Sequence, residues 1–109
     1  MKVLYENSFL RDIKKVNKKN IKEQLFQTIE NIKVGKELSS LNNVVKLKGH
    51  SSAYRLKIGN YRLGFFYEND YITLSRFLHR KDIYKKFPWM ERNKWTVHIS
   101  LVHLSRLKA

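Results

Sequence analysis

The stretch from residue 53 to residue 67 constrains the fold more than any other part of the chain. It runs AYRLKIGNYRLGFFY, with apolar and polar side chains alternating on both sides of the dipeptide Gly59-Asn60. This alternation has the two-residue period of a β-strand, and Gly-Asn is typical of a two-residue β-turn. The pattern predicts an antiparallel hairpin. A second turn at Asn69-Asp70 adds a further strand over residues 71–79.

The turn also fixes which side chains of the hairpin share a face. If Gly59-Asn60 forms the whole loop, Lys57 lies opposite Arg62, and the apolar residue before Lys57 lies opposite the apolar residue after Arg62. The basic residues Arg55, Lys57 and Arg62 then emerge together on one face, and the apolar residues line the other. We expect this open face to be an anion site, with Gly64 leaving space for a ligand beside Arg55. The alternative is that these long side chains splay into solvent.

The residues before the hairpin predict one strand and two helices. Residues 2–5 form a short strand candidate. Asn7 or Ser8 can cap a first helix. A second amphipathic helix is expected over residues 21–34, with Gly35 placed to end it. The fold class is therefore α+β, an antiparallel sheet of order β-α-α-β-β-β with both helices on one face.

The charge of the chain favours a polyanionic partner. Twenty-three Lys and Arg residues stand against nine Asp and Glu, for a formal net charge of +14, and the middle of the chain is the most basic part. Most arginines of the chain lie in this middle part, and Arg suits bidentate contact with phosphate. They are Arg55, Arg62, Arg76 and Arg80. The alternative interpretation is a basic surface that serves solubility alone.

Several classes of protein are excluded by composition. A chain of 109 residues has room for one domain, and without Cys it has no disulfide or thiol nucleophile. No apolar run of membrane-spanning length occurs, and the apolar run at the N-terminus is too short for a signal peptide. These features predict a cytoplasmic protein with no membrane contact. The four His residues lack close spacing with carboxylates, so no metal site and no cofactor are expected.

A second basic cluster follows the last predicted strand and runs HRKDIYKK from residue 79. Arg80 and Tyr84 are four residues apart and share a face if the segment is helical. A cation beside an exposed aromatic ring suits a nucleotide, because the charge can hold phosphate and the ring can stack on a base. The alternative is a charged turn after an edge strand.

Three motifs in this order resemble the RelE/ParE superfamily of bacterial toxins, and its RelE-type mRNA interferases in particular. They are LKGH at residues 47–50, the hairpin YRLKIGNYRL at residues 54–63, and HRKDIY at residues 79–84. The resemblance covers residues 1–88. We therefore expect a toxin domain over 1–88, followed by a C-terminal extension over 89–109.

The resemblance implies an activity and a set of site residues. RelE-type toxins cut mRNA on the ribosome without a metal, by attack of a ribose 2′-OH on the adjacent phosphate. This chemistry needs a base, cations on the phosphorane and an acid for the leaving oxygen. The catalytic residues carried over by position are Lys57 as base, Arg62 as phosphate stabiliser, Arg80 at the leaving group and Tyr84 as stacking partner. The substrate-binding candidates are Arg55, Lys48, His50, His79 and Lys81, and the two His residues are alternatives for proton transfer.

Other functions within the same superfamily remain open. A ParE-like toxin would inhibit DNA gyrase and cut no RNA, and an inactive homologue would bind only its antitoxin and, through it, operator DNA. The resemblance implies the ribosome, mRNA and a cognate antitoxin as partners, and the charge suggests that this antitoxin is acidic.

The segment 89–109 does not follow the pattern of the family. Its apolar residues fit a strand or a helix equally well. It could extend the sheet, cover an apolar groove, mediate dimerisation or be an appendage foreign to the family core. If it lay over the basic face, it would obstruct the site.

Overall fold

The central hairpin has the register that its turn predicts. In the computed structural model, which describes residues 1–88 and 96–97, β3 (Ala53–Ile58) pairs with β4 (Tyr61–Glu68) so that Lys57 lies opposite Arg62. Gly59 takes a positive φ of 58° in the turn, a conformation that favours glycine. β5 (Tyr71–His79) then pairs antiparallel with β4, and one register shift occurs after Gly64.

The whole sheet has the order β2-β3-β4-β5-β1-β6. The antiparallel arrangement is confirmed for the strands from β2 to β5, but β1 (Lys2–Glu6) lies parallel to β5. Parallel pairing is possible because the chain crosses over through two helices between β1 and the hairpin. The strand β2 (Val44–Lys46) has only three residues and was not predicted.

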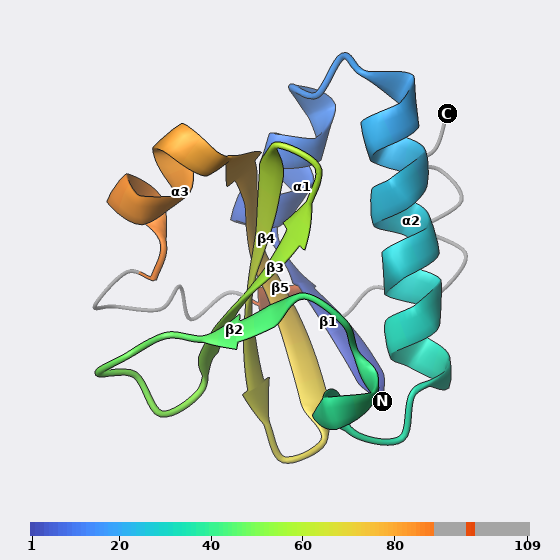
Figure 1. Ribbon diagram of the computed structural model, residues 1–109, viewed down its shortest axis with the longest axis vertical. Coiled ribbons are helices and arrows are strands. Elements are labelled where there is room, and N and C mark those ends of the chain that lie inside the picture. The colour runs from blue at the N-terminus through green and yellow to red at the C-terminus, as the bar shows by residue number, and fades with distance from the viewer. Residues whose placement is uncertain (89–95, 98–109) are drawn as a thin grey trace.

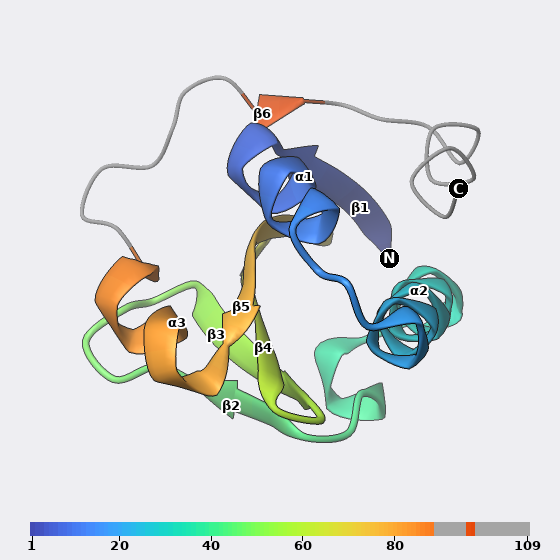
Figure 2. The ribbon, with the colours of Figure 1, turned by 90° about the horizontal axis from the view of Figure 1, so that it is seen from above.

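Two helices follow β1, as predicted, and lie on one side of the sheet (Figures 1 and 2). These are α1 (Asn7–Lys14) and α2 (Lys19–Val34), and Gly35 follows the end of α2. The predicted cap of α1 was wrong, because the helix begins at Asn7 and makes no side-chain cap bond. The Ser8 hydroxyl instead donates to the carbonyl of Ser75 at 2.7 Å and so ties α1 to β5. A short 3₁₀ turn (Leu38–Ser40) leads into β2.

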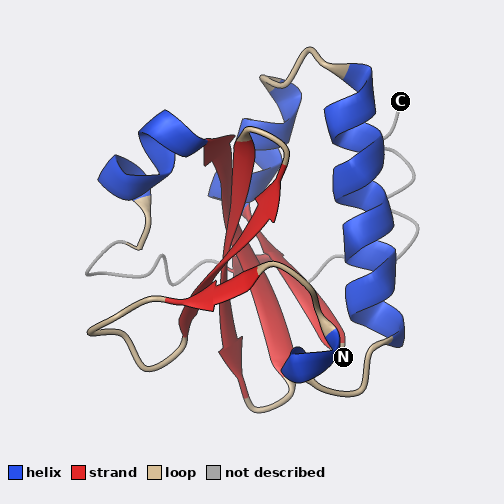
Figure 3. Cartoon of the chain, viewed as in Figure 1, coloured by secondary structure: helices blue, strands red, loops and turns tan. Residues whose placement is uncertain are grey.

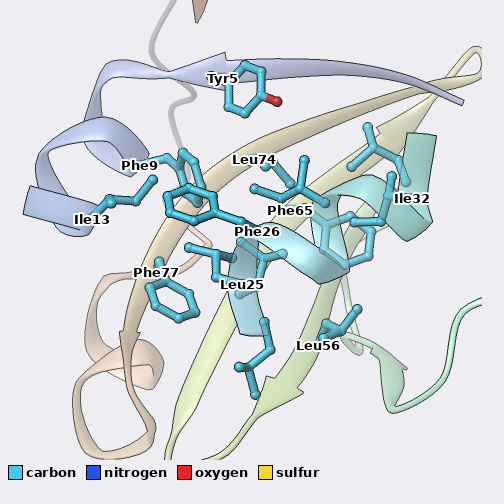
Figure 4. Packing of buried hydrophobic residues seen from close by; sticks show 14 of the residues in the cluster. Tyr5, Phe9, Ile13, Leu25, Phe26, Ile32, Leu56, Phe65, Leu74 and Phe77 are labelled. Carbon is cyan, nitrogen blue, oxygen red and sulfur yellow. The ribbon is translucent and has the colours of Figure 1, made fainter. Parts of the chain in front are cut away.

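The larger hydrophobic core fills the space between these helices and the sheet (Figure 4). Phe9, Leu25 and Ile29 come from the helices and are fully buried, and they pack with Leu63 and Phe65 of β4. These are the positions that the helical and strand periodicities place on the inner faces. At roughly 1.5–3 kcal/mol for each large side chain, this core is the main source of stability.

An ion pair fastens α1 to the edge of β5 beyond the end of β1. The carboxylate of Asp12 is buried and accepts from Arg76 Nε at 2.8 Å and from Arg76 Nη2 at 3.0 Å. The same carboxylate also accepts from the backbone N–H of Phe77 at 2.9 Å. Phe77 lies beyond the part of β5 that pairs with β1. Arg76 is one of the arginines that the sequence analysis counted as suited to phosphate. It has a structural partner instead.

A smaller core lies on the other face of the sheet, under α3 (Arg80–Lys86). Ile83 and Phe87 pack there against Ala53 and Phe66, so neighbouring residues of β4 belong to opposite cores. Figure 3 shows α3 and α2 on opposite sides of the strands. The helical geometry expected for residues 80–84 is confirmed. The expectation of an open face was wrong in part, because α3 covers the end of the hairpin away from its turn.

Part of the C-terminal extension joins the sheet. Thr96–Val97 forms β6, which pairs antiparallel with β1 at Tyr5 and Glu6. Of the roles considered for this segment, extension of the sheet is confirmed for these two residues, which lie at the edge far from β3. The rest of 89–109 is outside the described residues, and the boundary at residue 88 stays a prediction. In the described part, no helix is long and apolar enough to cross a membrane.

Candidate functional site

The cationic face predicted from the hairpin forms in the structure. We use this name for Arg55, Lys57 and Arg62, together with Arg80 and Tyr84 of α3. Because Lys57 pairs with Arg62 and Arg55 pairs with Gly64, the three hairpin cations share the face opposite the larger core. Lys57 is exposed, and both arginines are half-buried.

Arg62 is held in place by the turn that precedes it. Its Nη1 donates to the carbonyls of Gly59 at 3.0 Å and Tyr61 at 2.9 Å. These bonds place the guanidinium beside the turn and restrict its rotation. The Nε–Nη2 edge is the part of the group that can still contact an anion with two parallel bonds.

Arg55 lies beneath the ring of Tyr84. The guanidinium carbon is 4.7 Å from the ring centroid, within the range of a cation–π interaction, and the residue Tyr84 is 69% exposed. An exposed ring held over a cation keeps an accessible face for a further planar group. This contact joins the hairpin to α3 in one site.

The first residue of α3 is tied to the turn of the hairpin. The backbone N–H of Arg80 donates to the carbonyl of Asn60 at 2.8 Å, and the Arg80 side chain is exposed. Arg80 therefore begins α3 at the end of the hairpin where Lys57 and Arg62 lie, and Tyr84 follows one helical turn later. The structure thus brings together all four residues predicted as catalytic.

Gly64 does not leave space for a ligand. A Cβ at this position would lie 2.7 Å from ring atoms of Phe87, and Phe87 is buried. The missing side chain makes room for this ring, which packs α3 against the sheet. The expectation was wrong because Phe87 is 23 positions away in sequence, and no local pattern links it to Gly64.

The remaining predicted residues are more dispersed. His79 precedes α3 and caps it, since its Nδ1 accepts from the backbone N–H of Lys81 at 3.2 Å. Its ring contacts Tyr61, which faces the larger core, so His79 points away from Lys57. Lys48 and His50 belong to the loop between β2 and β3, at the end of β3 away from Lys57. Ala53 and Lys57 are about 13 Å apart along the strand. Their roles in substrate binding stay predictions.

The arrangement matches what phosphoryl transfer from RNA requires. Several fixed cations on one face can stabilise the charge that develops on a pentavalent phosphorus, and an amine beside them can exchange a proton. Within residues 1–88 and 96–97, no group of three or more His, Asp or Glu side chains is placed to bind a metal.

The fold and the site together define a class of protein. It is a small α+β domain with two helices on one face of its sheet and a cluster of basic side chains, bordered by a short helix, on the other. The model of a family described as the ParE toxin of the type II toxin–antitoxin system parDE matches residues 3–84. The chain belongs to this RelE/ParE superfamily, which confirms the resemblance based on its motifs.

Two individual proteins are similar to this chain. Toxin RelE3 of Methanocaldococcus jannaschii is 38% identical over 89 residues, which cover 81% of this chain and the full length of the relative. A chain in the crystal structure of the RelB-RelE antitoxin-toxin complex from Methanococcus jannaschii is 34% identical, with a TM-score of 0.68 over 78% of this chain and 99% of that chain. The similarity therefore extends from fold to sequence over most of the domain.

Proposed function

We propose that this protein is the toxin of a type II toxin–antitoxin system and that it cleaves mRNA on the ribosome. The contact between Arg55 and Tyr84 carries this proposal, because it joins the basic hairpin and α3 into one site with a cation and a stacking ring. The similarity to proteins named RelE supports the same conclusion.

In the proposed reaction, the 2′-OH of one nucleotide attacks the adjacent phosphate. Lys57 accepts the proton of the 2′-OH, and the guanidinium of Arg62 binds the nonbridging oxygens as their charge increases. The bond to the 5′ oxygen of the next nucleotide breaks, and Arg80 stabilises the charge on this leaving oxygen. The leaving oxygen takes a proton from a water molecule, and the protonated Lys57 returns its proton to the hydroxide that remains. The products are a 2′,3′-cyclic phosphate and a free 5′-OH. Tyr84 stacks on a base and holds the chain for in-line attack.

The proposal includes a cognate antitoxin as partner. The related structure is titled as an antitoxin-toxin complex, and the charge of +14 favours an acidic chain that folds as it binds. Co-expression with the neighbouring reading frame, followed by purification of a stable complex, tests this part.

Primer extension on mRNA from a translating extract tests the activity. The wild type is expected to create new mRNA ends, whereas Lys57→Ala and Arg80→Ala are each expected to reduce the cleavage rate by about 10²-fold or more. Lys14→Ala is the matched control, because Lys14 is an exposed cation of α1 on the other side of the sheet. No cleavage by the wild type, or equal loss in the control, contradicts the proposal.

A gyrase assay separates this function from the other known activity of the superfamily. The matching family model is named for ParE toxins, so inhibition of DNA supercoiling by the purified protein is the specific alternative. Supercoiling that is inhibited while mRNA stays intact would replace the proposed function by that alternative.

A further inference from the structure

A groove lined by amide side chains lies next to the cationic face. It consists of two adjoining cavities of about 400 and 440 Å³ between α2 and the hairpin. Both are lined by Thr28 of α2, by Asn43 before β2 and by Lys57 of β3. We use the name amide groove for this pair of cavities.

Lys57 borders both the cationic face and the amide groove because β3 extends beyond its neighbour β2 there. β2 begins at Val44, which pairs with Leu56, so Lys57 and Ile58 extend beyond the end of the neighbouring strand. The backbone N–H of Lys57 donates to the carbonyl of Asn43 at 3.2 Å, and this bond closes the wall of the groove. A chain bound at the cationic face can therefore continue over this edge toward α2.

Three of the α2 side chains that line the groove are amides, and Thr28 and Val34 complete this wall. Gln24, Gln27 and Asn31 lie at spacings of three and four residues, which places them on one face of the helix over about 10 Å. Gln27 donates to the Asn31 side chain at 3.2 Å, so neighbouring amides order one another. Among the described residues that line the groove, Lys57 is the one charged side chain, and no carboxylate occurs.

This chemistry differs from that of a neighbouring hollow on the described surface. The cavity on the adjacent flank of α2 is lined by Glu23 and Glu30 as well as Lys19 and Lys22, and a carboxylate there would repel RNA. The amide groove has neither this repulsion nor a row of cations for phosphates. Amide groups carry both a donor and an acceptor, the combination that pairs with the edges of unstacked bases.

We propose that the amide groove binds the bases of single-stranded RNA next to the scissile phosphate and sets the sequence preference of cleavage. In this division of roles, the cationic face holds phosphates, and Gln24, Gln27 and Asn31 contact base edges. The proposal rests on the proposed function for its substrate and adds where the substrate continues and which residues select it.

Binding of uncleavable RNA tests the groove apart from the chemistry. Fluorescence anisotropy is measured with labelled 2′-O-methyl homopolymers of A, C and U of about twelve nucleotides. The wild type is expected to bind them with affinities that differ by about fivefold or more, and Gln27→Ala/Asn31→Ala to lose most of this difference. Asn17→Ala is the control, because Asn17 is an exposed amide before α2 and outside the groove. Circular dichroism of each variant verifies the fold.

Mapping of cleavage sites gives a second readout. On translating ribosomes, Gln27→Ala/Asn31→Ala is expected to cleave at a redistributed set of sites, with a total rate that falls less than in Lys57→Ala. Homopolymer affinities and cleavage sites that match the wild type would overturn the inference. If the wild type binds with a base preference that depends on the groove but cuts no mRNA, the proposed function fails and the groove assignment stands.

Discussion

The two faces of the sheet are built from the same alternating strands but differ in how they are covered. On one face, α1 and α2 bury a continuous core, and Phe65 is fully inaccessible. On the other, α3 covers a small cluster around Phe66, and the basic residues surround its border. The difference shows a division of labour between stability and function. The large core supplies the free energy of folding, and the small core orients the short helix that carries Arg80 and Tyr84.

The largest expected effect is a difference in stability between substitutions at Phe65 and Phe66, which are adjacent in β4 and lie in opposite cores. Phe65→Ala is expected to lower the free energy of unfolding by about 3–5 kcal/mol, because it opens a cavity in the large core. Phe66→Ala is expected to cost less and to reduce amide protection of α3 more than that of α2. Chemical denaturation and hydrogen exchange measure the two effects. Val45→Ala is the control, since its apolar side chain is 51% exposed. Equal destabilisation by both Phe variants would contradict the division between the faces.

A second substitution tests the packing of α3 against the sheet. Gly64→Ala adds a Cβ 2.7 Å from the ring of Phe87, so the ring must move. We expect a loss of about 1–3 kcal/mol in thermal unfolding and a slower cleavage rate, because α3 shifts relative to Lys57. Gly64→Ala/Phe87→Leu is expected to recover part of the stability, and no recovery would mean that the clash is not the cause.

The burial of Tyr5 in the large core predicts that the stability of the protein depends on pH. Burial, and to a lesser extent the nearby Glu30, raises the pKa of Tyr5 to about 12 from 10.0, and its buried hydroxyl has no hydrogen-bond partner among the described residues. A folded pKa above the unfolded one means that stability is retained below pH 10 and lost as the pH rises through about 12. Tyr5→Phe is expected to lose less stability than the wild type over this range. Parallel loss in both proteins, measured by denaturant titration, would contradict this assignment.

The smallest effect concerns the contact across the cationic face. A double-mutant cycle with Arg55→Ala and Tyr84→Ala is expected to give a coupling energy of about 0.5–1 kcal/mol, since the pair is partly exposed. Tyr84→Phe is expected to retain the coupling, because the ring and not the hydroxyl contacts Arg55. Additive effects of the two Ala variants on unfolding would show that the contact does not join hairpin and helix.

Most of the site could be predicted because it depends on local structure, namely the register of the hairpin and the spacing along α3. The turn at Gly59-Asn60 determined that Lys57 and Arg62 share a face, and spacing placed Arg80 and Tyr84 together on a helix. The amide groove could not be predicted, since it combines residues of α2 with Asn43 and Lys57, which no periodicity connects. Arg76 was misjudged for the same reason, because its partner Asp12 comes from a distant helix.

The sequence by itself determined most of the helices and strands, the hairpin register and the family. Alternation and helical spacing act over a few residues, so they report local structure directly. The tertiary structure decided the parallel pairing of β1 with β5, the packing of Phe87 over Gly64, and the position of α3 beside the hairpin cations. These features depend on which distant surfaces can be buried together, and this is decided only when the whole chain packs.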